Sequence, residues 1–438
     1  MSSTQYATQN IITQAILIPL GIISSVIIAR ILGVEGRGVY AYIVLLSSFF
    51  IPILSFGYPA GAVYEISRRQ FSVKNISFTN ALISLAQGTL VAAIILVLWY
   101  FDKLGKTGQQ ISPQIIAIVI VLIYSNTLLR FSLKNIVADS WFTLDNITQI
   151  LRKIIIPFMV IVMIIFFSEK ILGGAVGLLA GSGILLLVVL FNIWKKYRPK
   201  LRLDKDFIKK SYAYGFKGWF GQLSVNANTR IDQLILGAAA SAEALGNYSI
   251  AVMLSELIWI LPMALGQVIY NRVAGDSNQA ANLELVKKTH RILLSFLLLC
   301  TLFAALVGPH IIPFVYGNDF SGAILPFLVL LPGTFIMVST KLLSKLFTAS
   351  GHIAVTNKVQ IISSIVSIIL YLTLIPRMGI LGAAIAAAIG YTIGAVVFWY
   401  YYKKTFAERL IELFWVKRSD IQWAYERCLF LWENIRSK

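Results

Sequence analysis

The sequence has few charged residues and few of the residue types that carry catalytic chemistry. Only 13% of its 438 residues are charged, whereas a soluble chain has about a quarter. Its two cysteines, Cys300 and Cys428, are far apart in the sequence and give neither a disulfide framework nor metal-ligand spacing. No Walker loop and no HExxH motif is present. The composition excludes an ordinary soluble enzyme, and we expect no metal and no cofactor.

Long apolar runs make up most of the chain. Hydrophobic residues account for 58% of it, and the mean hydropathy is +0.79. A membrane-spanning helix needs about 20 mainly apolar residues, and unbroken runs such as ALISLAQGTLVAAIILVLWY lack the alternation of barrel strands. The expected fold class is therefore an all-α polytopic membrane protein. We predict twelve spans, at residues 10–31, 39–63, 76–101, 112–133, 151–169, 171–194, 213–238, 245–270, 289–315, 321–347, 353–376 and 379–402.

The net charge of +19 is unevenly distributed along the chain. If the N-terminus is cytoplasmic, most Lys and Arg fall in loops on that side, including the loop KKYRPKLRLDKDFIKK at 195–210. Loops rich in bases stay in the cytoplasm, and twelve spans return the C-terminus to the same side. Both termini are thus predicted to be cytoplasmic. Because the bases alternate with spans, the anionic headgroups of membrane lipids explain them better than nucleic acid does.

The basic loop separates two halves that resemble each other. At a shift of 208 positions the matching pairs are Gly38 with Gly246, Tyr40 with Tyr248, and Gly174 with Gly382, and Asn146 precedes Asn357 by 211. Each half has six spans, so the copies have the same orientation, with a pseudo-two-fold axis along the membrane normal. We predict an N-terminal lobe (1–194), a cytoplasmic linker (195–211), a C-terminal lobe (212–402) and a cytoplasmic tail (403–438).

The tail has the pattern of an amphipathic helix. Ile421, Tyr425, Cys428, Trp432 and Ile435 recur at helical spacing among bases. This pattern favours a helix lying on the inner leaflet over a thirteenth span. A helix that binds a partner protein is the alternative.

Three stretches carry a family resemblance. The sequence ARILGVEGRGVYAYIVLLSSFFIPILSFGYPAGAVYEISR (29–68) resembles the opening of O-antigen-type polysaccharide flippases, members of the multidrug/oligosaccharidyl-lipid/polysaccharide exporter superfamily. RIDQLILGAAASAEALGNYSIA (230–251) resembles the start of their second lobe, and FVYGNDFSGAILPFLVLLPG (314–333) their ninth-to-tenth span connection. Twelve spans count against the lipid II flippase branch, which often has fourteen.

The resemblance implies a two-lobed, V-shaped bundle that alternates between inward-open and outward-open states. It implies an oligosaccharide linked to undecaprenyl diphosphate as substrate, moved from the cytoplasmic to the periplasmic leaflet of the bacterial inner membrane. Lipopolysaccharide or other cell-surface polysaccharide assembly would be the setting, with assembly proteins as possible partners.

Ionisable side chains within the apolar runs are candidate functional residues. Such groups face the bundle interior or a water-filled cavity. In NTRIDQLILG the two charged residues Arg230 and Asp232 are about 200° apart around a helix, so they face different neighbours. The helix at 213–238 is therefore predicted to line the space between the lobes. A guanidinium binds oxyanions through two hydrogen bonds. The predicted phosphate contacts are Arg230, Arg30, Lys341 and Lys345.

A second set of polar residues is predicted to couple transport to an ion. Glu256, or less readily Asp232, would be a site for a proton or a sodium ion, with Asn226 and Asn228 nearby on the helix of Asp232. A purely structural network that fixes helix packing remains the alternative for Arg230, Asp232 and Glu256.

Two other functions compete with the flippase. A cation-coupled multidrug extruder would use a more acidic or more apolar cavity. A membrane glycan polymerase or ligase would need a substantial outer loop to hold its acceptor and catalytic bases, and the predicted outer loops are short. A transporter without enzymatic activity is therefore the favoured reading.

Overall fold

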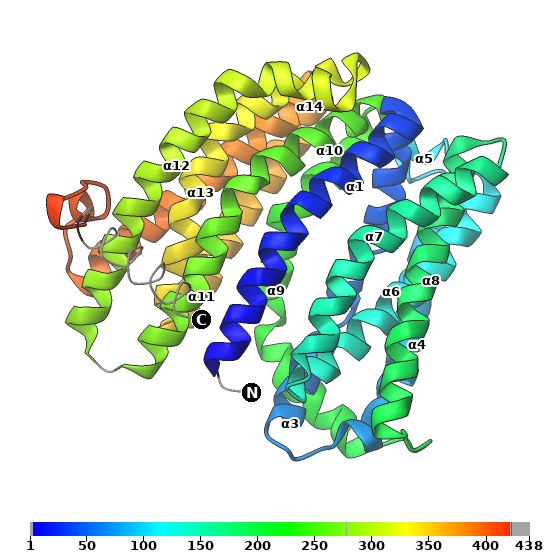
Figure 1. Ribbon diagram of the computed structural model, residues 1–438, viewed down its shortest axis with the longest axis horizontal. Helices are drawn as coiled ribbons and strands as arrows, with labels where there is room; N and C mark the ends of the chain where they lie inside the picture. The colour runs from blue at the N-terminus through cyan, green and yellow to red at the C-terminus, as the bar shows by residue number, and fades with distance from the viewer. Residues whose placement is uncertain (1–2, 277, 421, 423–438) are drawn as a thin grey trace, which may run out of the picture. The chain divides into compact units, whose positions relative to one another are not determined.

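The computed structural model describes residues 3–276, 278–420 and 422, and this part of the chain is helical with no strand (Figure 1). The predicted all-α fold class is confirmed. The helices are α1 (Ser3–Leu46), α2 (Phe50–Leu54), α3 (Tyr58–Ser67), α4 (Val73–Tyr100), α5 (Gly105–Gly108), α6 (Pro113–Ala138), α7 (Phe142–Phe166), α8 (Lys170–Tyr197), α9 (Lys205–Ala239), α10 (Ala242–Glu256), η1 (Leu257–Trp259), α11 (Ile260–Gly275), α12 (Gln279–Tyr316), η2 (Asn318–Ala323), α13 (Ile324–Ala349), α14 (Ile353–Phe406) and η3 (Leu410–Leu413).

The described residues form nine helical segments long and apolar enough to cross a membrane. Two of them contain a sharp break, because Gly33 in α1 has φ 72° and Gly379 in α14 has φ 55°. Only glycine adopts such angles at little cost, so each break separates two predicted spans. The predicted span 213–238 lies within α9, which is too polar to be one of the nine. The count is consistent with twelve crossings.

The connection between α6 and α7 is much shorter than the hydropathy predicts. Apolar windows place the spans at 112–133 and 151–169, but the helices leave only residues 139–141 between them. Hydropathy misses these helix ends because one face of each is polar. Arg152 consequently lies about 15 Å along α7 from its first residue, and not at the inner edge of a span as the apolar window 151–169 suggests.

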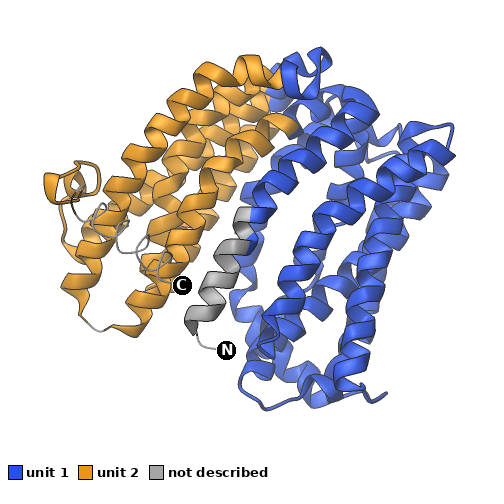
Figure 2. Ribbon diagram, in the orientation of Figure 1, with its two compact units in different colours: residues 1–249, 313–322, 375–380 blue, residues 250–312, 323–374, 381–438 orange. Residues whose placement is uncertain are grey.

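The chain groups into two compact units (Figure 2). Unit 1 comprises residues 1–249, 313–322 and 375–380, and unit 2 comprises 250–312, 323–374 and 381–438. This grouping follows packing in the structure. The division into lobes at the linker 195–211 stays a prediction.

In unit 1, α9 packs against α3 with its backbone in direct contact. A Cβ on Gly57 would overlap the carbonyl oxygen of Gly215, and a Cβ on Gly61 would overlap that of Ser211. Beside this contact an aromatic core forms around Tyr58, whose ring stacks on Phe131 at 5.8 Å between centroids. Both positions require glycine because the two backbones approach too closely to leave room for a side chain.

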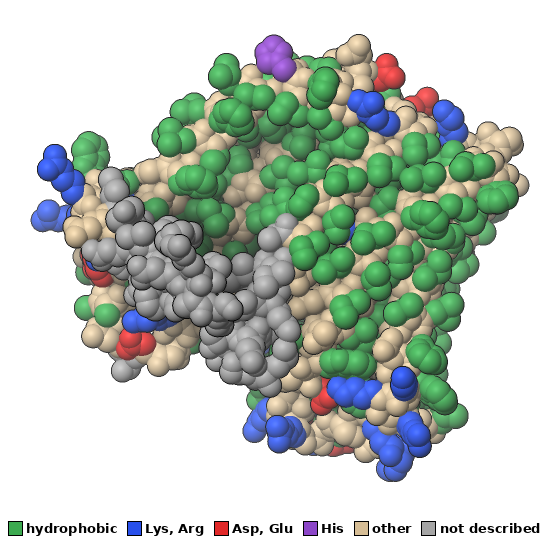
Figure 3. Space-filling model, in the orientation of Figure 1, with side chains coloured by type: hydrophobic (Ala, Val, Ile, Leu, Met, Phe, Trp, Pro, Cys, Tyr) green, Lys and Arg blue, Asp and Glu red, His purple; other side chains and the backbone are tan. Residues whose placement is uncertain are grey.

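Unit 1 has the surface expected of a membrane protein. On the face drawn in Figure 3, hydrophobic side chains cover the flank of its helices. Lys and Arg gather at the end of this unit where α3 lies. This separation agrees with apolar flanks in lipid and a basic end in contact with headgroups.

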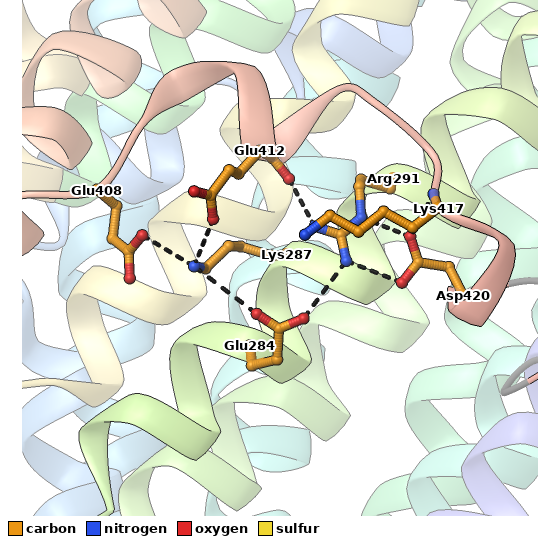
Figure 4. A network of polar contacts seen from close by, with 7 residues as sticks. All are labelled: Glu284, Lys287, Arg291, Glu408, Glu412, Lys417 and Asp420. Carbon is orange, nitrogen blue, oxygen red and sulfur yellow. Dashed lines mark hydrogen bonds and ion pairs between the residues drawn. The ribbon is translucent and has the colours of Figure 1, made fainter.

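Unit 2 holds the first part of the tail against α12 through a charged clasp (Figure 4). Lys287 donates hydrogen bonds to Glu408 and Glu412, both at 2.8 Å. Arg291 binds both carboxylate oxygens of Asp420, from Nε at 2.6 Å and from Nη2 at 2.8 Å. Both partners of this bidentate pair are fully buried. The amphipathic helix predicted from Ile421 to Ile435 lies outside the described residues.

Candidate functional site

Unit 1 contains a cavity of about 580 Å³ between α6, α7 and the junction of α1 with α2. Its lining comes from one face of each helix, since positions three, four and seven residues apart lie on the same side. The lining residues are Ser48, Ile51, Asn126, Leu129, Arg130, Leu133, Lys134, Val137, Asp145, Gln149 and Arg152.

The cavity is basic. Three lining side chains are cations, Arg130, Lys134 and Arg152, and one is a carboxylate, Asp145, which accepts a hydrogen bond from Gln149 at 2.8 Å. Among the described residues none of the three cations forms an ion pair. A cation within a membrane-spanning segment is costly unless it is paired or hydrated. A basic cavity of this kind is suited to an anion that supplies the missing negative charge.

A further base lies on α1. Arg37 lies over the ring of Tyr40, 5.8 Å from its centroid. The Nε of Arg37 is buried and has no hydrogen-bond partner among the described residues. Tyr40 also lies within electrostatic range of Arg152 of the cavity. The first half of the chain thus has more intramembrane bases than its hydropathy indicates.

The predicted residues of α9 face other parts of unit 1. Asn226 donates to the carbonyl of Phe49 at 3.1 Å, so it ties α9 to the junction of α1 and α2. Asp232 is buried and accepts a hydrogen bond from Tyr248 of α10 at 2.8 Å. Asn228 is buried and Arg230 is half-buried. That Arg230 and Asp232 point in different directions stays a prediction.

Arg30 caps the end of a helix. Its Nε donates to the carbonyl of Val315 and its Nη2 to that of Phe314, both at 2.7 Å. These carbonyls belong to the last turn of α12, where the helix leaves its acceptors unused and cations are favoured. The structure therefore gives Arg30 a packing contact, and its assignment to phosphate stays a prediction.

The remaining predicted residues lie in unit 2. Lys341 of α13 has its Nζ 4.5 Å from the ring centroid of Trp259, and Lys345, one turn later, lies 5.9 Å from that of Tyr270. Cation–π contacts of this kind stabilise partly buried amines. Glu256 is half-buried at the end of α10, directly before η1. The roles predicted for these three residues stay predictions.

Sequence reasoning missed Arg130, Lys134 and Arg152 as candidate site residues. It treated them as bases of an inner loop because one apolar window ends at 133 and the next begins at 151, which puts all three at or beyond a window edge. The available signal was their spacing, since Arg130 and Lys134 are four residues apart, as are Asp145 and Gln149, with Arg152 three further on. Four-residue spacing of polar groups indicates one helix face. No cluster of three metal-ligating side chains occurs in the part of the chain that the structure describes.

Known proteins are similar to this chain in sequence or in fold. Residues 6–274 match the family described as polysaccharide biosynthesis protein. The chain is 24% identical over 272 residues to the amylovoran biosynthesis protein AmsL of Erwinia amylovora, covering 61% of this chain and 68% of that protein. It is 25% identical over 196 residues to the probable flippase AglR of Haloferax volcanii, covering 42% of this chain and 40% of that protein.

The solved structure of the lipid II flippase MurJ, in an inward closed conformation, is similar with a TM-score of 0.69. The match has 13% identity and covers 92% of this chain and 88% of that one. At this identity the similarity shows the fold, a helical membrane protein with two lobes. The family match extends over more than half of the chain. The chain belongs to the polysaccharide biosynthesis protein family.

Proposed function

We propose that the protein moves an undecaprenyl-diphosphate-linked oligosaccharide from the inner to the outer leaflet of the bacterial inner membrane. The observation that carries this proposal is the basic cavity of unit 1, where three cations face one carboxylate and form no ion pair among the described residues. A diphosphate has the charge and the oxygen acceptors that such a cavity lacks. The transported glycan would then join the assembly of a cell-surface polysaccharide.

The bases of the cavity bind the phosphates, and its amides bind sugar. Arg130 and Arg152 each offer a planar fork of donors that matches two phosphate oxygens, and such charge-assisted hydrogen bonds are the strong ones. Asn126 and Gln149 line the same cavity and offer donors and acceptors to glycan hydroxyls. The polyprenyl chain stays in the surrounding lipid, because it is a hydrocarbon and has no polar group that the cavity could bind.

Residues outside the cavity complete the proposal. Arg230 of α9, together with Lys341 and Lys345 of α13, provides further phosphate contacts as the transporter alternates its access. Glu256, or Asp232, takes a proton or a sodium ion that drives the cycle. Both chain termini face the cytoplasm, where the basic end of unit 1 contacts anionic lipid.

The cavity disfavours the main competing cargo. A small cationic drug would be repelled by three cations facing one carboxylate, since like charges in a low-dielectric site cost several kcal/mol. A multidrug extruder therefore has less support from the cavity than a transporter of anionic lipids.

A reconstitution assay tests the proposal. Liposomes containing the purified protein and a fluorescent lipid-linked oligosaccharide report translocation, and ethidium uptake serves as the drug assay. We expect translocation of the oligosaccharide and not of ethidium. Arg152→Ala and Arg230→Ala should each slow translocation about 10- to 100-fold, since a hydrogen bond to a charged group contributes about 1.5–3 kcal/mol.

The matched control is Lys195→Ala, which removes a base from an exposed position outside the cavity and should leave translocation unchanged. Full translocation by Arg152→Ala, in protein that remains folded, would remove the cavity from the proposal. Transport of ethidium in place of the oligosaccharide would replace the proposed substrate class altogether.

A further inference from the structure

Two helices of the chain correspond residue by residue. α6 and α13 both contain 26 residues. Pro113 and Ile324 begin them, Ala138 and Ala349 end them, and both separations are 211 positions. The next helices, α7 and α14, begin at Phe142 and Ile353, again 211 apart. The structure therefore fixes the register of the internal repeat in this region, independently of residue identity.

In this register the basic residues of the two helices coincide. Arg130 corresponds to Lys341, and Lys134 corresponds to Lys345. Bases are 38 of the 438 residues, so a base at both of two fixed positions is rare by chance. The other charged residues of the cavity are not repeated, since Asp145 corresponds to Thr356 and Arg152 to Ser363. Of the four charged residues that line the cavity, the repeat has a charged counterpart only for Arg130 and Lys134.

Each pair has the same place on its helix. The members are four residues apart and so share one face. They lie eight and four residues before the last residue of the helix, about 12 Å and 6 Å from its inner end. A long basic side chain at this depth reaches an anionic group near the inner leaflet. Equal depth and equal spacing indicate equal function.

The surroundings of the two basic pairs differ, and the difference predicts which pair binds an anion more tightly. Arg130 and Lys134 line an open cavity. Lys341 and Lys345 lie against the rings of Trp259 and Tyr270, and the stem of Lys345 is 3.2 Å from where a Cβ of Gly266 would be. An anion that approaches the second pair must compete with the aromatic rings. The first pair also has a guanidinium, which binds two phosphate oxygens at once.

Building on the proposed function, we infer that the two pairs are repeat-related binding sites for a phosphoryl anion, one in each unit, and that the pair on α6 binds more tightly. Each recognises the charge and oxygens of the carrier's diphosphate group near the inner leaflet. The common ancestor of the two repeats then already carried an anion site on this helix, and Arg152 and Asp145 are elaborations of the first copy.

Anion titration of the purified full-length protein tests this inference. Inorganic pyrophosphate is titrated calorimetrically into protein in nonionic detergent, and we expect two binding events of different affinity. Arg130→Gln combined with Lys134→Gln should remove the tighter event and leave the weaker one. Lys341→Gln combined with Lys345→Gln should do the opposite. Lys403→Gln combined with Lys404→Gln, an exposed basic pair of the tail, is the matched control and should retain both events.

Several results would overturn the inference: a single event in the wild type, the loss of both events in either double variant, or the loss of neither. If a double variant does not fold, the single variants Lys134→Gln and Lys345→Gln replace it, each expected to weaken one event about tenfold. Arg130→Lys should retain the tighter event at reduced affinity, because the charge remains and the fork is lost.

Two further measurements are needed. One distinguishes a carrier diphosphate from a bilayer lipid as the source of the anion, and the other distinguishes failure of the binding sites from failure of the proposed function. Short-chain phosphatidylglycerol should compete poorly with pyrophosphate, and equal competition would assign the pairs to bilayer lipid and overturn the inference. Both events present in a protein that does not move the lipid-linked oligosaccharide would refute the proposed function and keep the sites. Normal translocation by both double variants with unchanged pyrophosphate binding would refute the sites and keep the function.

Discussion

Gly38 and Gly246 lie against each other, and each excludes a side chain for the same reason. A Cβ on Gly38 would overlap the carbonyl oxygen of Ala242, and a Cβ on Gly246 would overlap that of Val34. Val34 precedes Ala242 by 208 positions, as Gly38 precedes Gly246. A contact in which equivalent residues exchange equivalent partners is the mark of a two-fold relation. All four residues belong to unit 1, so the repeat read from the sequence is visible in one compact part of the structure.

We expect Gly38→Ala and Gly246→Ala to have similar effects. Each methyl group must push apart two helix backbones, and overpacking of this kind costs about 1–3 kcal/mol. Both variants should melt several degrees below the wild type, and both should translocate the lipid-linked oligosaccharide more slowly. Thermal unfolding in detergent and the liposome assay measure the two effects.

The control for these variants is Gly183→Ala. A Cβ at Gly183 has no atom within 4 Å, so alanine there should be neutral or stabilise its helix by up to about 1 kcal/mol. If Gly38→Ala melts like Gly183→Ala, the close contact is not a constraint on the sequence. If the two variants Gly38→Ala and Gly246→Ala differ widely, their equivalence fails.

The buried pair between Arg291 and Asp420 should govern the attachment of the tail. Asp420→Asn removes the bidentate carboxylate from the buried guanidinium and leaves only Glu284, at 3.5 Å, as a charged partner. Breaking such a buried pair costs about 3–5 kcal/mol. We expect trypsin to cut at Lys417 and Arg418 much faster in this variant. Glu408→Gln is the control, because Lys287 retains Glu412 at 2.8 Å; it should be cut at the wild-type rate. A tail equally protected in both variants would show that other contacts hold it.

The clasp should withstand mild acid. Burial works against ionisation of Asp420, but hydrogen bonds from Arg291 and from the Lys417 N–H prevail and hold its pKa below the ordinary 3.8. The hydrogen bond from Lys287 likewise lowers the pKa of Glu412 below 4.5. A carboxylate with a lowered pKa stabilises the fold above its unfolded pKa, and this stabilisation is lost as the pH falls through the folded value.

The difference in melting temperature between wild type and Asp420→Asn should therefore be constant from about pH 5 to pH 8 and shrink only below about pH 4. Calorimetric scans across this range measure it. A difference that disappears between pH 5 and pH 6 would mean that a group other than these carboxylates controls the clasp.

Much of the fold follows from local properties of the sequence. Apolar runs of about 20 residues form helices in lipid because their backbone groups have no other partner there. Breaks fall where glycine permits a positive φ, as at Gly33 and Gly379. The candidate site was less accessible to prediction. Hydropathy averages over all faces of a helix, so it ended one span at 133 and began the next only at 151. Arg130, Lys134 and Arg152 fell at or beyond the edges of these windows and were treated as loop bases.

The sequence by itself determined that this protein is a helical membrane protein built from two related halves, because composition and repeated glycine positions act locally or along the chain. Only the tertiary structure decided which charges meet. In the structure Arg30 donates hydrogen bonds to the last turn of α12, Asp232 accepts one from Tyr248, and Arg291 pairs with Asp420. Arg130, Lys134 and Arg152 line a cavity. These partners come from helices distant in sequence, and only packing in three dimensions selects among the many charges that could pair.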